Sequence, residues 1–201
     1  MTGKVVAESV PERLRMRKAD RRSAVIDEAI RIIGDQGYRG FSINDLAKRC
    51  GLTTAGLLHH FGSKEGLLIA LLEERDRRDS QAVAGRLEMQ RGQCLTREQV
   101  LIVLHAIVRQ NSGQPHLVRL YAMLRAEALT RDHPARQFFL DREQGTRAMF
   151  AEIIAPYVED AAATARQLAA TMHGLETQWL REECSFDLVA EWDKAAAKLL
   201  H

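Results

Sequence analysis

The side chains with the clearest chemistry lie between positions 53 and 64. Thr53 and Thr54 supply hydroxyls, His59 and His60 supply imidazoles, and Lys64 supplies an ammonium group. Side chains of these types donate hydrogen bonds to phosphate oxygens and reach the edges of bases. Adjacent histidines on a helix point about 100° apart because one turn takes 3.6 residues, so they cannot easily share one metal ion. The segment therefore favours contact with a polyanion over a metal site.

Charge is distributed unevenly along the 201 residues, although the formal net charge is only +2. Residues 1–72 carry 12 lysines and arginines against 8 acidic residues, whereas residues 73–201 carry 17 against 19. Seven of the early cations precede Ser23. Residues 1–72 are therefore basic, whereas the rest of the chain is slightly acidic. This asymmetry favours an anionic polymer as the binding partner of the N-terminal part, although a solvated basic tail would give the same counts.

Short helices are expected to position these side chains. Apolar residues recur at intervals of three and four from about residue 20, and this pattern stops at Gly37, which can take the left-handed conformation that ends a helix. Ser42 is suited to cap a second helix that closes at Gly51. Thr53 can cap a third, running to about residue 60, and Ser63 a long helix from residue 64 through 78 and towards 90.

Two short helices joined by a turn at Gly51 are typical of a helix-turn-helix, whose second helix can enter the major groove of DNA. Leu46, Leu52 and Leu57 would form the small core between the two helices. Spacing alone would also fit any corner between two helices. The helix-turn-helix interpretation therefore needs support from the residue types.

That support comes from a resemblance over Ala29–Leu72. This stretch, AIRIIGDQGYRGFSINDLAKRCGLTTAGLLHHFGSKEGLLIALL, resembles the DNA-binding domain of the TetR family of transcriptional regulators. The register holds through Gly37-Tyr38, Phe41-Ser42, Asp45-Leu46-Ala47, Gly51-Leu52 and His60-Phe61-Gly62-Ser63-Lys64-Glu65. One position departs, because Leu58 stands where the family usually has a tyrosine. The resemblance implies an all-α fold, with an N-terminal three-helix DNA-binding domain containing the helix-turn-helix and a larger C-terminal helical domain for ligand binding and dimerisation.

The third helix and its neighbours form the predicted DNA-binding site. The expected contacts are Ser42, Thr53, Thr54, Ala55, Gly56, Leu58, His59, His60 and Lys64. Small and hydroxylic residues let a helix lie deep in a groove, so Thr54 and Ala55 are expected at base edges. Lys64 and the free N–H groups at its helix start can grip a phosphate together, a role the family resemblance also implies. Leu58 either touches a thymine methyl group or packs inward.

The chain beyond residue 73 is predicted to contain further helices and no strands. Its apolar run at 100–108 is expected to be buried, with His105 as the only polar member. Polar side chains also interrupt the apolar stripe of a helix that Pro134 opens. The candidate effector-pocket residues are His105, Tyr121, Glu143, Thr146, Phe150 and Met172. A core histidine and a helix with an exposed middle would explain the same pattern.

Two heptad-like seams near the C-terminus predict close helix packing. Their residues, proposed as a dimer interface, are Ala165, Leu168, Met172, Leu175, Trp179, Val189, Trp192 and Ala196. One pair of seams could instead pack within the chain. The TetR resemblance, which extends to the segment GLETQWL, implies that the two C-terminal helices pair with their copies as a four-helix bundle. A homodimer is therefore expected.

These patterns predict three parts of the chain: a flexible basic arm at 1–18, a helix-turn-helix domain at 19–66, and a helical effector-binding and dimerisation domain at 67–201. The predicted protein is a ligand-responsive regulator, more often a repressor in this family. It would bind a pseudo-palindromic operator in double-stranded DNA as a homodimer and be released by an unidentified small-molecule effector. An effector-independent DNA-binding protein, acting as an activator or in chromosome organisation, is the alternative.

Other classes find little support in the sequence. It contains no nucleophile elbow, P-loop, metal-binding helix pair or dinucleotide fingerprint, so we expect no catalytic residues, cofactor or metal, and no enzyme. No uninterrupted apolar run is long enough for a membrane span, and the N-terminus lacks a signal-peptide core. The three cysteines are odd in number and far apart, which suits a reducing compartment. The expected location is therefore the cytoplasm.

Overall fold

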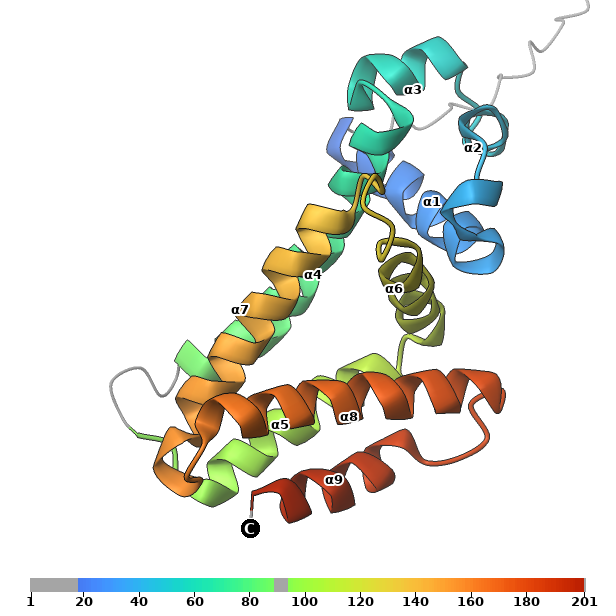
Figure 1. Ribbon diagram of the computed structural model, residues 1–201. Helices are drawn as coiled ribbons and strands as arrows, with labels where there is room; N and C mark the ends of the chain where they lie inside the picture. The colour runs from blue at the N-terminus through green and yellow to red at the C-terminus, as the bar shows by residue number, and fades with distance from the viewer. Residues whose placement is uncertain (1–17, 89–93, 201) are drawn as a thin grey trace, which may run out of the picture.

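The computed structural model describes residues 18–88 and 94–200, and within these ranges the chain folds into helices with no strand (Figure 1). The elements are α1 (Lys18–Gly40), α2 (Ile43–Arg49), α3 (Thr54–Phe61), α4 (Lys64–Glu88), α5 (Arg97–Ser112), α6 (Pro115–Glu127), α7 (Arg136–Ile154), the 3-10 helix η1 (Ala155–Tyr157), α8 (Ala161–Arg181) and α9 (Leu188–Leu199). This confirms the predicted all-α class. The predicted basic arm at 1–18 lies outside the described residues, apart from Lys18 at the start of α1.

Local capping chemistry sets the starts of α2 and α3 as predicted. The Ser42 hydroxyl accepts from the Asp45 N–H at 3.4 Å, and the Thr53 hydroxyl accepts from the Gly56 N–H at 3.0 Å. Each hydroxyl satisfies a backbone donor that a helix start leaves without an internal partner. Gly37 leaves the helical conformation inside α1 with φ 72°, a region that glycine enters without a Cβ clash. These local features fix where α2 and α3 begin and where the helical path of α1 breaks.

One hydrophobic core joins the N-terminal helices to the rest of the molecule. Ile26 of α1, Leu46 of α2, Leu57 of α3 and Leu68 of α4 are completely or almost completely buried in a cluster that also includes apolar residues of α6 and the start of α7. Leu120 of α6 is fully buried there. Helix α1 therefore packs on α6 as well as on α4, and α6 lies beside α1 in Figure 1.

A second core fills the space between α5, α7, α8 and α9. Its largest members are Trp192 and Phe150, which are 1% and 0% exposed, and Leu104 of α5 is fully buried beside them. The expectation that the apolar run at 100–108 is buried on all sides is wrong at Ile102, whose side chain is 57% exposed. α5 packs against α9, α4, α6 and α7, and Ile102 lies on the part of α5 that these helices leave exposed.

The predicted dimer interface is wrong for six of its eight residues. Ala165, Leu168, Met172, Trp179, Trp192 and Ala196 are all buried within this single chain. The reason is that α8 and α9 turn their apolar seams toward α5, α7 and each other, where the Trp192 Nε1–H donates to the Leu104 carbonyl at 3.1 Å. Leu175 and Val189 are only partly buried and lie at the edge of the same core.

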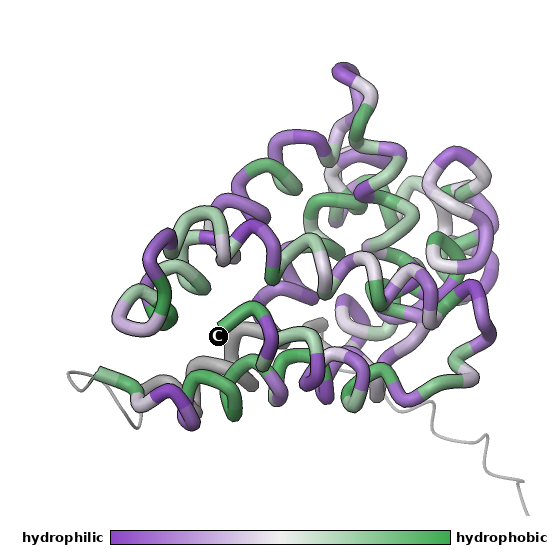
Figure 2. The backbone as a smooth tube through the Cα atoms, turned by 60° about the horizontal axis from the view of Figure 1, so that its bottom comes forward, coloured by the Kyte–Doolittle hydropathy of each residue, from purple (hydrophilic) through white to green (hydrophobic). Residues whose placement is uncertain are grey.

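The helices are amphipathic rather than uniformly apolar. Hydrophobic and hydrophilic stretches alternate along the tube in Figure 2, as expected when each helix covers a core with one face. In the described part of the chain, no helix is both long enough and apolar enough to cross a membrane.

Candidate nucleic-acid interface and ligand cavity

Helix α3 presents an open face at one end of the molecule (Figure 1). Thr53, Ala55, His59 and His60 are exposed, whereas Leu57 is fully buried beneath them. Leu58 is 36% exposed, so its side chain lies on the outer face and does not join the core. Of the two roles considered for Leu58, this placement is compatible with contact to a thymine methyl group.

The hydroxyls of this region also hold the helix-turn-helix together. The Thr54 Oγ1–H donates to Oδ1 of Asn44 at 2.7 Å and so ties α3 to α2. Gly56 is partly buried, and a Cβ on it would lie 3.1 Å from the capping Oγ1 of Thr53. Thr54 is partly buried and its hydrogen bond stabilises the helix-turn-helix, whereas its neighbour Ala55 is exposed.

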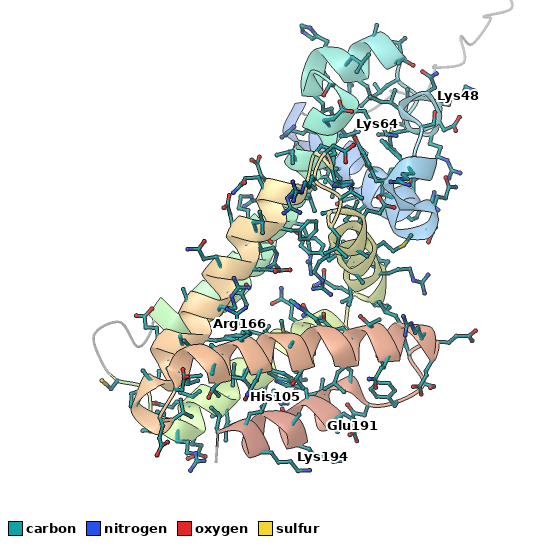
Figure 3. All side chains as sticks on the ribbon, in the orientation of Figure 1. Lys48, Lys64, His105, Arg166, Glu191 and Lys194 are labelled. Carbon is teal, nitrogen blue, oxygen red and sulfur yellow. The ribbon has the colours of Figure 1, made fainter. Side chains whose placement is uncertain are left out.

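Lys64 lies on an aromatic platform that the sequence did not predict. Its Nζ is 4.6 Å from the ring centroid of Tyr38 and 5.6 Å from that of Phe41. The Tyr38 hydroxyl donates to Glu65 at 3.4 Å, and burial raises the pKa of this phenol above its usual range. The rings hold the ammonium at the start of α4 by cation–π attraction. Figure 3 shows Lys64 at the same end of the molecule as Lys48, whose side chain is 81% exposed.

A cavity of about 490 Å³ lies between α4, α5, α6, α7 and α8. This volume falls in the usual range for small-molecule sites. Five of the six predicted pocket residues line it, namely Tyr121, Glu143, Thr146, Phe150 and Met172. The lining also includes polar side chains that were not among the predicted pocket residues: Arg75, Asp76, Gln110, Asn111, Arg125, Arg142, His173 and Glu176.

The prediction that His105 lines this cavity is wrong. Its position on α5 faces α9 instead, and its Nδ1 lies 2.8 Å from Oδ2 of Asp193 (Figure 3). The cavity faces a different side of α5, from which Ile107, Gln110 and Asn111 line it. His105 therefore links α5 to α9 on the opposite side of the helix.

One wall of the cavity is organised around Tyr121. The guanidinium carbon of Arg75 lies 3.9 Å from the centre of its ring, and that of Arg142 lies 5.0 Å away. The Tyr121 hydroxyl is 3.2 Å from both the Leu72 carbonyl and Oδ1 of Asp76. Arg142 Nε lies 2.9 Å from the same Asp76 oxygen. Burial raises the pKa of the Tyr121 phenol, so this hydroxyl stays protonated as a donor.

Helix α8 contributes a carboxyl group and an imidazole to the cavity wall. Glu176 is 6% exposed, its Oε1 accepts from the Asn111 amide at 2.6 Å, and burial raises the pKa of its carboxyl. Burial also lowers the pKa of His173 to about 3, assisted by the positive charges of Arg125 and Arg142. The imidazole is therefore neutral at physiological pH and can offer both a donor and an acceptor.

The low pKa of His173 predicts a contribution to acid sensitivity. As the pH falls from 6.5 toward about 3, the unfolded chain binds this proton while the folded chain does not. Unfolding is therefore favoured by about 1.4 kcal/mol for each pH unit in that window. Glu176, whose pKa is raised by burial, contributes with the opposite sign.

Denaturant unfolding at several pH values between 6.5 and 5 would measure this effect. We expect His173→Gln to lose stability less steeply than the original chain, because the variant lacks this proton uptake. His116→Gln, at an exposed position on α6, is the matched control and should keep the original slope. Equal slopes for the original chain and His173→Gln would contradict the prediction.

Comparison with known proteins identifies the family of the N-terminal helices. The family described as "Bacterial regulatory proteins, tetR family" matches residues 25–71. The HTH-type transcriptional regulator BetI of Cronobacter sakazakii is 30% identical over 172 residues, which span 82% of this chain and 80% of that protein. The chain belongs to the TetR family. It is therefore a helix-turn-helix transcriptional regulator that binds DNA, and its relatives are regulators rather than enzymes.

Other TetR-family matches are shorter or less similar in sequence. BetI of Rhizobium meliloti is 46% identical over 52 residues, only 26% of either protein, and the repressor AcnR of Corynebacterium glutamicum is 33% identical over 73 residues, 35% of this chain and 39% of AcnR. The FadR regulator of Bacillus subtilis, solved with stearoyl-CoA, superimposes with a TM-score of 0.73 at 20% identity over 89% of this chain and 97% of that one. This last likeness supports the fold.

Proposed function

We propose that this TetR-family regulator is a homodimeric repressor that binds a pseudo-palindromic operator and is released when a small molecule occupies the cavity. The observation that carries the proposal is the presence of both parts in one chain. An exposed recognition face on α3 and a cavity of about 490 Å³ are joined through the same two helices, α4 and α6.

In this proposal α3 enters the major groove. Ala55 and Leu58, both exposed, contact base edges, and Gly56 lets the helix approach closely. Thr54 lies close to the base edges and keeps its hydrogen bond to Asn44. The phosphate contacts come from the remaining predicted residues: Ser42, Thr53, His59, His60 and Lys64.

Two helices can carry the response from the cavity to the DNA. α4 begins with Lys64 at the DNA-binding end and lines the cavity with Arg75. α6 lines the cavity with Tyr121 and ends at Glu127, whose Oε1 lies only 2.8 Å from where a Cβ on Gly37 would stand. A ligand that binds one arrangement of these helices more tightly would shift the separation of the two recognition helices and so the operator affinity.

The repressor assignment and the effector rest on relatives. AcnR, a relative over the N-terminal part of the chain, is named as a repressor, and FadR of Bacillus subtilis, which shares the fold, was solved with stearoyl-CoA. These support a repressor whose body binds a small molecule.

Because the apolar seams of α8 and α9 are buried, the proposed dimer uses the outward face of α8. Ala163 and Ala170 are exposed there, and a Cβ added to the neighbouring Gly174 would meet no atom within 4 Å. Small side chains allow two helices to approach closely. The two copies of α8 and α9 would then form a four-helix bundle across a two-fold axis.

Repeated selection from a randomised DNA pool, at two salt concentrations, tests the proposal. Enrichment of a two-fold symmetric motif is expected, with two half-sites about one helical turn apart, roughly 34–36 Å. Salt-sensitive binding without a motif would contradict the operator-reading role. A motif whose occupancy no metabolite changes would instead favour the effector-independent alternative.

Lys64→Ala is expected to weaken binding to all DNA sequences by a similar factor and to reduce the slope of log affinity against log salt by about 1. The reason is that an ammonium held over the Tyr38 and Phe41 rings would act on the phosphates as a point charge and would not distinguish bases. Leu58→Ala should instead change the preferred sequence and leave the slope unchanged. Fluorescence anisotropy with operator and random DNA over a salt series measures both.

Lys194→Ala provides a matched control, because this exposed lysine lies on α9 at the far end of the molecule from Lys64 (Figure 3). Its affinity and salt slope should equal those of the original chain. If Lys64→Ala kept the full salt slope, or changed sequence preference as Leu58→Ala does, the proposed division between backbone and base contacts would be wrong.

A further inference from the structure

The cavity holds charged groups of both signs, and their pairing decides what it can bind. Arg75, Arg125 and Arg142 supply three guanidinium groups, while the carboxyl groups come from Asp76, Glu143 and Glu176. Equal numbers of the two signs would favour a neutral ligand if each charge had an opposite partner inside the cavity.

The carboxyl groups, however, are already engaged. Asp76 lies 2.9 Å from Arg142 Nε. Glu143 lies 3.6 Å from the Nη1 of Arg147, a residue that does not line the cavity. Glu176 accepts from Asn111 at 2.6 Å, and its burial disfavours the ionised form.

Arg125 differs from these groups. Its guanidinium, partly buried in the cavity wall, makes no hydrogen bond or salt bridge to any residue that the structure describes. Glu176 and Glu143 act on it only at longer range, and burial lowers the pKa of Arg125 because its charge is poorly solvated. A partly buried cation in this position is stabilised by an anion that binds beside it.

An organic cation fits the cavity less well. Such ligands are recognised over the face of an aromatic ring, and Tyr121 is the ring at the charged wall. The guanidinium of Arg75 already lies 3.9 Å from the centre of that ring, with Arg142 nearby at 5.0 Å. A second cation would meet both positive charges.

The cavity also has apolar walls. They consist of Ile107, Val118, Phe139, Met149, Phe150 and Met172. Methionine side chains adapt to ligands of irregular shape, and the apolar wall favours burial of a hydrocarbon body. A ligand that satisfies both parts of the cavity therefore has a charged head and an apolar body.

We propose that the effector is an amphipathic oxyanion, with its carboxylate or phosphate bound by Arg125 and its hydrocarbon body against the apolar wall. This inference rests on the proposed function, because it names the ligand class of the same cavity. A planar guanidinium binds either oxyanion through two parallel N–H donors, so the headgroup is assigned by experiment.

Calorimetric titration of the full chain with ligands that share one body but differ in headgroup tests the proposal. The probes are octanoate, octyl phosphate, octanol and octylamine, each below its micelle-forming concentration, with 3-phenylpropanoate as an aromatic carboxylate. At least one oxyanion is expected to bind roughly tenfold or more tightly than octanol and octylamine, as a charge-assisted hydrogen bond implies. The better of octanoate and octyl phosphate identifies the headgroup.

Arg125→Gln should abolish that preference, because the amide keeps polarity but loses the charge. Arg119→Gln, an exposed arginine on the same helix, should leave it unchanged. Should Arg125→Gln fail to fold by circular dichroism, the comparison of probes on the original chain still decides the question, and Arg125→Lys, which keeps the charge, should retain part of the preference.

The proposal would be overturned if no oxyanion bound, if octanol or octylamine bound equally well, or if Arg125→Gln bound the oxyanion as before. These outcomes are separable from failure of the proposed function. Oxyanion binding to a chain that selects no DNA motif would contradict the operator-reading role alone. Release from a selected motif by a neutral or cationic compound would contradict the oxyanion alone.

Discussion

Replacing Trp192 by alanine is expected to lower the free energy of unfolding by about 3–5 kcal/mol, the usual cost of removing a large buried aromatic side chain. The indole of Trp192 is 1% exposed in the core between α5 and α9, and its Nε1–H donates to the Leu104 carbonyl at 3.1 Å. The alanine variant loses this packing and leaves a cavity that the neighbouring helices cannot fully close. Urea denaturation followed by circular dichroism measures the difference.

The exposed lysine on the same helix serves as the control, and Lys194→Ala should stay within about 0.5 kcal/mol of the original chain. The experiment also separates two roles for Trp192. If the alanine variant kept its full stability but became monomeric by size-exclusion chromatography with light scattering, the indole would lie in the dimer interface that the sequence predicted, and the intrachain core would be wrong there.

Gly66→Ala is expected to cost about 1–3 kcal/mol of stability and to weaken operator binding by at least tenfold. Gly66 lies in the first turn of α4, where a Cβ would overlap the carbonyl oxygen of Phe61 at the end of α3. That oxygen belongs to the backbone and cannot rotate away, so α3 and α4 must separate. Because α4 also carries Lys64, the recognition face and the phosphate contact would no longer keep their relative positions.

Thermal unfolding and anisotropy with the selected operator would measure the two effects of Gly66→Ala. Gly145→Ala is the matched control, since a Cβ at this position in α7 meets no atom within 4 Å. Alanine is the better helix former, so the control should gain up to about 1 kcal/mol. A Gly66→Ala variant as stable as the original chain, with unchanged operator affinity, would show that α3 and α4 tolerate the separation.

The sequence alone determined the helices of the DNA-binding end and their limits. Ser42 and Thr53 cap α2 and α3 as predicted, and Gly37 and Gly51 take positive φ values where the helices were expected to end. These features depend on hydrogen bonds and backbone angles within a few residues of one another. Such local features can therefore be predicted from the order of neighbouring residues.

The orientation of each helix was decided only by the tertiary structure. The spacing of apolar residues located the apolar faces of α8 and α9 but did not show which helices cover them. The apolar face of α9 that includes Trp192 packs inside the chain. His105 faces α9 rather than the cavity, and Leu58 lies on the outer face of α3. Periodicity defines an apolar face, whereas its partner depends on contacts between residues far apart in the chain.

The charged wall of the cavity likewise could not be predicted from the sequence. Arg75, Arg125 and Arg142 come from three different helices, and each resembles an ordinary surface arginine among its sequence neighbours. Packing of five helices brings the three guanidiniums around one space and buries His173 and Glu176 beside them. Charges interact through distances in space rather than along the chain, so only the folded molecule determines which charges share a site and which ligand they favour.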